Sequence, residues 1–285
     1  MVSHGTELNL ADFVYRTPMD KLASGLARWA HYKQFQFVSI SHPDWILAAA
    51  IADIRYLCSG FAYFYQRNTA SLTEFKLLQP FRRRSQMSHS PVAGVARIQS
   101  ANNLISIEPD GYRWHLALHS KQLSANLLLA PGDIAEPLAL CLPTGYSGWT
   151  YTQKHNGLQV SGDINLHQQP VAVNGALGGY DFSAGYMRRE TSWRWGSLSG
   201  YSGADVIGFN LAAGVNETGG TENCCWLNGK RYGLPPLQFI FNRQQPDTPW
   251  QVVSQCGAVK LQFMPAAKRQ ERLNLGLLAW QDSSE

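Results

Sequence analysis

The stretch Tyr112-Arg-Trp-His-Leu-Ala-Leu-His119 alternates large apolar side chains with polar or small ones. In a β-strand successive side chains point to opposite faces, so Trp114, Leu116 and Leu118 share one face. Alternation of this kind is typical of a strand with one buried face. A similar pattern recurs in four other stretches of the chain: 60–65, 237–243, 258–264 and 272–280.

Turn signals separate these stretches. The pairs Asp110-Gly, Asn156-Gly and Asn228-Gly favour tight hairpin turns, because both residue types tolerate a positive φ. Short strands at roughly ten-residue spacing are typical of a β-sandwich or β-barrel. The sequence therefore predicts an all-β fold.

Four segments need separate interpretation. The alanines of Trp45–Asp53 favour a helix and its neighbours favour a strand, so both remain open. Weak helical spacing over 21–35 predicts a short N-terminal helix, and the polar, proline-flanked segment 77–91 predicts a long connector. Prolines and glycines between apolar runs over 137–149 predict a domain boundary near residue 144. We expect an N-terminal domain of residues 1–143 and a C-terminal domain of residues 144–285.

Composition excludes several classes of protein. The 285 residues include 24 Lys and Arg against 20 Asp and Glu, a net charge of +4. The only basic run is Arg82–Arg84, so we expect no nucleic-acid partner. The five cysteines show no CxxC spacing, which favours reduced thiols and a cytoplasmic protein. We expect no signal peptide, and the longest apolar run, 45–52, is too short for an integral membrane segment.

The stretch 181–195 concentrates chemistry in a chain of which only 15% is charged. In one interpretation Trp193 and Trp195 line a pocket, Asp181 or a glutamate acts as an acid, and an arginine binds an anionic end of a ligand. In the other, both tryptophans fill the core and an arginine pairs with a carboxylate at the rim. The residues leave both interpretations open.

A second polar and aromatic cluster follows the apolar strand 206–212. Glu217 and Glu222 flank a Gly-Gly turn, which favours a solvated hairpin tip. Alternatively, Glu222 and Asn223 re-enter the fold beside Trp226, where burial would raise the pKa of a carboxyl group. Asn210 is either a structural hydrogen-bond node or a ligand contact.

Signatures of metal and cofactor sites are missing. His115 and His119 would lie about 13 Å apart on one strand face, too far to share an ion. The sequence has no P-loop and no strand-linked GxGxxG. In 196–200, Gly-Ser-Leu-Ser-Gly, a leucine stands where a nucleophile elbow needs its serine. We therefore expect no metal site and no cofactor.

Several motifs together resemble one bacterial family. They are Gly148-Trp-Thr-Tyr-Thr-Gln-Lys154, Gly178-Gly-Tyr-Asp-Phe-Ser-Ala-Gly185, Arg189-Glu-Thr-Ser-Trp-Arg-Trp195, Ile207-Gly-Phe-Asn-Leu211, Glu222-Asn223 with Trp226, and an N-terminal His42-Pro-Asp-Trp45. The chain is similar to the uncharacterised domain-of-unknown-function family two-eight-zero-four. That family belongs to the lipocalin-like calycin group and is distantly related to hydroxyneurosporene synthase, a carotenoid hydratase, and to AttH-like proteins.

The resemblance implies two consecutive antiparallel lipocalin-like β-barrel domains with a few short helices, the second carrying the site. It also implies a hydrophobic, lipid- or isoprenoid-like small molecule as partner. Some relatives hydrate or cyclise such ligands with acidic residues and without a cofactor, so a hydratase, lyase or isomerase is one hypothesis. The alternatives are a non-catalytic carrier and a structural or interaction protein.

Each candidate residue has an expected role under the catalytic hypothesis. The acid would be Asp181, Glu222 or Glu217, and the sequence does not choose among them. The oligomeric state is also left open. The expected ligand-binding residues are Arg189, Thr191, Trp193, Trp195, Asn210, Asn223 and Trp226.

Overall fold

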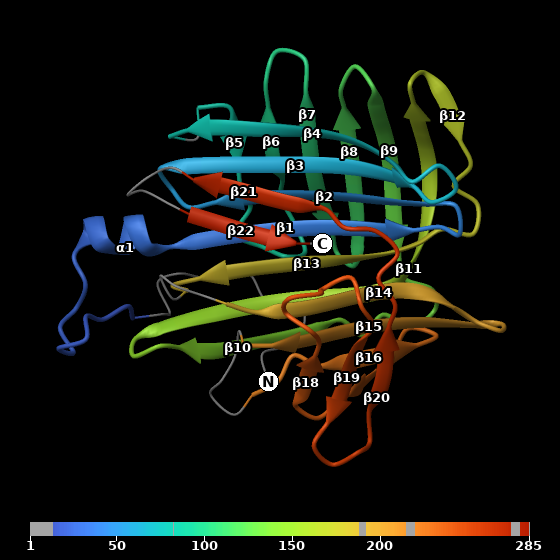
Figure 1. Ribbon diagram of the computed structural model, residues 1–285. Coiled ribbons are helices and arrows are strands. Elements are labelled where there is room, and N and C mark those ends of the chain that lie inside the picture. The colour runs from blue at the N-terminus through green and yellow to red at the C-terminus, as the bar shows by residue number, and fades with distance from the viewer. Residues whose placement is uncertain (1–13, 82, 188–191, 215–219, 275–279, 285) are drawn as a thin grey trace. The chain divides into compact units, whose positions relative to one another are not determined.

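The computed structural model describes residues 14–81, 83–187, 192–214, 220–274 and 280–284, with side chains as far as Gln270. The chain divides into two compact units, Met1–Leu234 and Pro235–Glu285. Nearly every element is a strand, and the described residues hold one α-helix, α1 (Gly25–His31). Figure 1 shows the elements and their labels.

One antiparallel sheet dominates the first unit. In spatial order its main path runs through β4 (Ser71–Pro80), β3 (Leu57–Gln66), β2 (Trp45–Asp53), β1 (Lys33–Ser41), β13 (Leu177–Gly185), β11 (Gly148–Leu166), β9 (Leu123–Ala130), β8 (Arg113–His119), β7 (Leu104–Asp110), β6 (Ala96–Gln99) and β5 (Ser85–Gln86). Two further strands, β10 (Leu138–Thr144) and β12 (Gln169–Val171), pair with β11.

The long strand β11 bends this sheet into a nearly closed barrel. Residues 150–159 pair with β13, residues 159–166 pair with β9, and the register shifts at Gly157. Gly162 permits the close approach to β9, because a Cβ there would lie 2.1 Å from the carbonyl oxygen of Asn126. As a result β6 to β9 cross behind β1 to β4 in a different direction (Figure 1).

The main core lies between these two layers of strands. Alternate residues of each strand enter it: Trp114 stacks on Tyr180 with ring centroids 4.0 Å apart, and Phe182 is fully buried. Burial of such an aromatic side chain stabilises the fold by about 1.5–3 kcal/mol. Since Tyr180 and Phe182 point inward, Asp181 and Ser183 between and beside them point to the outer face of β13.

A second sheet covers part of that outer face. It consists of β14 (Arg194–Ser202), β15 (Asp205–Ala213), β16 (Cys224–Leu227) and β17 (Lys230–Gly233) in sequence order. Asn156 of β11 joins the two sheets: its Nδ2 donates to the carbonyl of Phe209 at 2.8 Å, and Ser197 Oγ donates to its Oδ1 at 3.1 Å. The approach requires a glycine at 208, because a Cβ there would lie 2.8 Å from the backbone of Asn156.

The second unit contains two small sheets. One comprises β18 (Leu237–Ile240), β19 (Trp250–Ser254) and β20 (Lys260–Phe263), and the other pairs β21 (Gln270–Asn274) with β22 (Trp280–Ser284). Trp250 stacks on Phe241 at 4.1 Å and its indole donates to the carbonyl of Pro246 at 2.7 Å. These contacts hold Trp250, the first residue of β19, against the segment that precedes the strand.

The predicted all-β fold is confirmed, and the open segments are resolved. Trp45–Asp53 is strand β2, because pairing with both β1 and β3 buries it in the sheet. The N-terminal helix forms within the predicted range, with Ser24 Oγ accepting from the Ala27 N–H as N-cap. The connector predicted over 77–91 is wrong at its start, since β4 continues to Pro80, and β5 lies within it.

The domain boundary predicted near residue 144 differs from the boundary between the two compact units. Strands from both sides of residue 144 share the main sheet, in which β1 pairs with β13 and β9 with β11. The contacts divide the chain between Leu234 and Pro235. The division into residues 1–143 and 144–285 stays a prediction.

Candidate functional site

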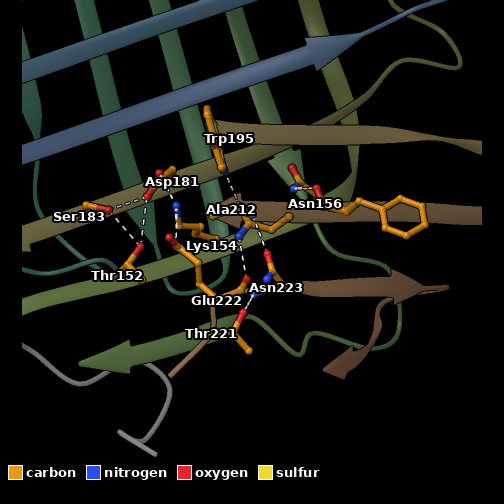
Figure 2. A network of polar contacts seen from close by, with 12 residues as sticks. Thr152, Lys154, Asn156, Asp181, Ser183, Trp195, Ala212, Thr221, Glu222 and Asn223 are labelled. Carbon is orange, nitrogen blue, oxygen red and sulfur yellow. Dashed lines mark hydrogen bonds and ion pairs between the residues drawn. The ribbon is translucent and has the colours of Figure 1, made fainter. Parts of the chain in front are cut away.

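Lys154 lies at the centre of a buried cluster of charges between the two sheets. It stands directly opposite Asp181 in the pairing of β11 with β13. Its Nζ donates to Asp181 Oδ2 at 2.7 Å and lies 3.0 Å from Glu222 Oε2 (Figure 2). Glu222 reaches the lysine from the segment just before β16. We call these three residues the Lys154 cluster.

Two hydroxyl groups complete the environment of Asp181. Ser183 Oγ donates to Asp181 Oδ1 at 2.8 Å, and Thr152 Oγ1 donates to the same oxygen at 3.3 Å. Thr152 and Ser183 also form a cross-strand pair with their hydroxyl oxygens 3.0 Å apart. Both carboxylate oxygens of Asp181 therefore have hydrogen-bond donors, so the carboxylate is held in one orientation (Figure 2).

The cluster is shielded from water. Lys154, Asp181 and Glu222 are each about 5% exposed. Burial by itself would lower the pKa of the Lys154 ammonium, but the charges of Asp181 and Glu222 outweigh burial and raise this pKa above its ordinary value. Asp181 and Glu222 thus hold Lys154 as a cation.

Trp195 and Asn210 link the covering sheet to this cluster. The Lys154 Nζ lies 5.1 Å from the centre of the Trp195 ring, within range of a cation–π interaction. The Trp195 indole donates to Asn210 Oδ1 at 2.7 Å, and Asn210 Nδ2 donates to the carbonyl of Glu222 at 2.8 Å. Asn210 is therefore a hydrogen-bond node that joins Trp195 to the backbone carrying Glu222.

Asn223 holds the same segment against β15. Its Oδ1 accepts from the backbone N–H of Ala212 at 2.6 Å, and its own N–H donates to Thr221 Oγ1 at 3.1 Å (Figure 2). These bonds fix the segment in which Glu222 follows Thr221. In this arrangement Asn223 positions the glutamate.

The other two predicted tryptophans differ in burial. Trp226 is buried beside Leu138 and Cys224, and its indole donates to the carbonyl of Glu136 at 2.8 Å. Trp193 is 55% exposed, immediately before β14. Arg189, Thr191 and Glu217 lie outside the described residues. Their proposed roles, like those of the other candidates, stay predictions.

The structure thus gathers Asp181, Glu222, Trp195, Asn210 and Asn223 around one point. Sequence reasoning missed Lys154, Thr152 and Ser183 as members of the site. A signal was present: Thr152 and Lys154 lie two positions apart, so on one strand they share a face. Only the pairing of β11 with β13 shows which acid the lysine meets.

A pocket of about 400 Å³ lies elsewhere, over the outer faces of β7, β8 and β9. Its lining includes Ser106, Glu108, His115 and Asn126. The hydrogen bond from Ser106, together with Arg97, holds the pKa of Glu108 below its ordinary value. This hollow is open to solvent, and its lining is largely polar.

Two negative observations concern the described residues alone. In this part of the chain no three His, Cys, Asp or Glu side chains lie close enough together to hold a metal ion. None of the described helices combines the length and the apolar character needed to cross a bilayer.

Comparison with solved structures shows where the fold recurs. An AttH-like protein of Nitrosomonas europaea is 12% identical, with a TM-score of 0.53 over 82% of this chain and 80% of that protein. Kievitone hydratase from Nectria haematococca is also 12% identical, with a TM-score of 0.54 over 77% of this chain and 72% of the hydratase. At this identity the likeness shows a shared fold.

Comparison of sequences gives the family. No curated protein sequence matches the chain. A family model, described as a domain of unknown function, DUF2804, matches residues 11–283, nearly the whole chain. The resemblance read from the motifs around Lys154, Asp181 and Trp195 is thereby confirmed, and the chain belongs to the DUF2804 family.

Proposed function

We propose that the protein is a cofactor-independent enzyme of the hydratase, lyase or isomerase type, acting on a hydrophobic small molecule such as a lipid or isoprenoid. The observation that carries the proposal is the Lys154 cluster: three ionisable groups buried together beside an indole ring. Burying charges costs free energy, and such clusters concentrate at functional sites.

The carboxyl groups of the cluster suit it to move a proton. Two of them lie within 3.0 Å of one ammonium nitrogen. A carboxylic acid in this cluster would add its proton to one carbon of a carbon–carbon double bond. A water molecule would bond through oxygen to the other carbon and return a proton to the cluster, so no net proton is consumed. Reversal of these steps would be dehydration.

The surroundings provide for the charge that develops on the substrate. The face of an indole ring stabilises a nearby cation. The Trp195 ring contacts the Lys154 ammonium, and its centroid lies 5.3 Å from that of the Phe37 ring. The fold shared with kievitone hydratase supports hydration as the reaction class. Which of Asp181 and Glu222 carries the proton stays open.

Isotope labelling tests the proposal. The protein is incubated in H₂¹⁸O with oleic acid, geraniol and squalene as probes, and products are analysed by mass spectrometry. We expect ¹⁸O in a new hydroxyl group, with the rate falling by roughly 10²–10⁴-fold in Asp181→Asn and Glu222→Gln. Glu108→Gln, in the separate polar pocket, is the matched control and should retain the rate. Undiminished turnover in the double variant would rule out the Lys154 cluster as the catalyst.

One observation favours a second candidate, a carrier that binds the same class of ligand without chemistry. The polar atoms of Asp181 and Lys154 already satisfy one another, as expected of a structural cluster. Native mass spectrometry of the freshly purified protein distinguishes the two. An unmodified lipid that stays bound in wild type and in Asp181→Asn alike, with no turnover, would favour the carrier.

A further inference from the structure

The N-terminal arm presents large apolar side chains to solvent. Between residues 14 and 29 five of them are exposed by 46–81%: Val14, Met19, Leu22, Leu26 and Trp29. None of the residues of α1 is buried. Leu26 and Trp29 are three positions apart, so they share one side of the helix. Exposed apolar side chains gathered on one short segment are typical of a surface that contacts another body.

The arm is anchored, so this apolar surface is held in place. Tyr15 stacks on Tyr186, with ring centroids 4.0 Å apart and planes nearly parallel, and its hydroxyl lies 2.9 Å from His31 Nδ1. Ala23 is buried and its N–H donates to the carbonyl of Tyr15. The inward side of the arm therefore packs on the end of β13, while Met19, Leu22, Leu26 and Trp29 face away. Figure 1 shows α1 projecting beyond the strand ends of the main sheet.

The charges around this apolar surface are mainly basic. Residues 14–32 contain Arg16, Lys21 and Arg28 and one acid, Asp20. Asp20 lies 3.6 Å from Arg16, which leaves the exposed Lys21 and Arg28 as excess positive charge. Two copies of this surface would bring like charges together. An anionic surface would meet complementary charge instead.

We propose that this arm docks on an anionic lipid bilayer surface. Leucine and methionine side chains with a tryptophan enter the boundary between headgroups and acyl chains, and basic residues beside them bind the headgroups. Leu22, Leu26 and Trp29 would insert, while Lys21 and Arg28 would contact lipid phosphates. The proposal stands on the arm alone and does not depend on catalysis at the Lys154 cluster.

Vesicle co-sedimentation of the full chain tests this. The vesicles are phosphatidylcholine alone and phosphatidylcholine with about 30% phosphatidylglycerol, each at low salt (about 0.05 M) and at high salt (about 0.5 M). We expect sedimentation with the anionic vesicles at low salt and a loss of about tenfold in partitioning at high salt. The double variant Leu22→Ser/Leu26→Ser should partition onto the anionic vesicles at least about tenfold less than wild type. The double variant Lys21→Glu/Arg28→Glu should show a similar loss.

The matched control is Tyr201→Ser, which removes a ring 54% exposed near the turn between β14 and β15, on the side of the first unit away from α1 (Figure 1). It should bind as wild type does. The proposal is overturned if wild type stays in the supernatant with both vesicles, or if the leucine variant sediments equally well. It is also overturned if light scattering without lipid shows a dimer that the leucine variant abolishes, since a second copy would then cover the surface.

Discussion

Lys154 and Asp181 stand directly opposite each other on β11 and β13, with Nζ 2.7 Å from Oδ2, although they are far apart in the sequence. Both side chains project from the outer face of the barrel, where the second sheet covers them. This pair and Glu222 give the molecule a buried charged centre. Its energetics can be measured separately from any activity.

Loss of the cation should be the most damaging change at this centre. In Lys154→Met the carboxylates of Asp181 and Glu222 lose their common partner while remaining buried. We expect the free energy of unfolding to fall by about 3–5 kcal/mol. Urea denaturation at pH 7 measures it. Lys76→Met is the control: its ammonium lies 3.4 Å from Glu74 at a largely exposed site, and the expected change is below about 1 kcal/mol. Equal losses in the two variants would contradict a buried ion cluster.

Removing either negative charge should cost less than removing the cation. Asp181→Asn or Glu222→Gln leaves Lys154 with one carboxylate partner, so its ammonium stays paired. We expect each to lower the free energy of unfolding by about 1–3 kcal/mol. The double variant strands the ammonium, and its loss should exceed the sum of the two single losses. A double-mutant cycle from urea unfolding measures this coupling, and strict additivity would show that the carboxylates act independently.

The raised pKa of Lys154 predicts a loss of stability at alkaline pH. The group keeps its proton in the folded state at pH values where the unfolded chain, with the ordinary value of 10.5, has lost it. The unfolded state then binds fewer protons, so stability falls as pH rises above about 10.5 and is fully present below it. Burial raises the pKa of Tyr180 as well, which acts in the same direction.

Comparing wild type with Lys154→Met isolates the lysine. The difference between their unfolding free energies should be constant from pH 7 to about 9 and shrink above about 10.5. Urea unfolding along a pH series measures it, with Tyr180 common to both proteins. A difference that stays constant to pH 12 would mean that Lys154 gains no stabilisation as a cation.

The contact between the sheets should be sensitive to a single methyl group. In Gly208→Ala the new Cβ would lie 2.8 Å from the backbone of Asn156, so the two sheets must separate. We expect a loss of about 1–3 kcal/mol. Gly200→Ala in β14 is the control, since its Cβ would meet only Leu198 at 3.9 Å. Thermal unfolding of both compares them, and similar midpoints would show that the sheets tolerate the separation.

Local patterning predicted much of the secondary structure. The alternation of Trp114, Leu116 and Leu118 is strand β8, with those side chains in the core. Propensity left Trp45–Asp53 open between helix and strand. Tertiary pairing decides it, because the segment is a central strand flanked by β1 and β3. The connector predicted over 77–91 begins too early, since β4 extends to Pro80 through its pairing with β3.

The candidate site was only partly visible in the sequence. Asp181, Trp195, Asn210 and Glu222 attracted attention because acids and tryptophans are dense there. Lys154 did not, because a lone lysine on a strand usually faces solvent. The structure brings Asp181 and Glu222 together between the outer face of the main sheet and the sheet β14–β17, and the expected site in a second barrel stays a prediction.

The sequence by itself determined the strand-rich fold, the family and the residue types available for chemistry, because period-two alternation and turn pairs act over a few neighbouring residues. Only the tertiary structure decided that Lys154, Asp181 and Glu222 meet. That meeting depends on the register of β11 against β13 and on a second sheet closing over them. Since a shift of one residue would turn every side chain of a strand to the opposite face, neither can be read from local patterns.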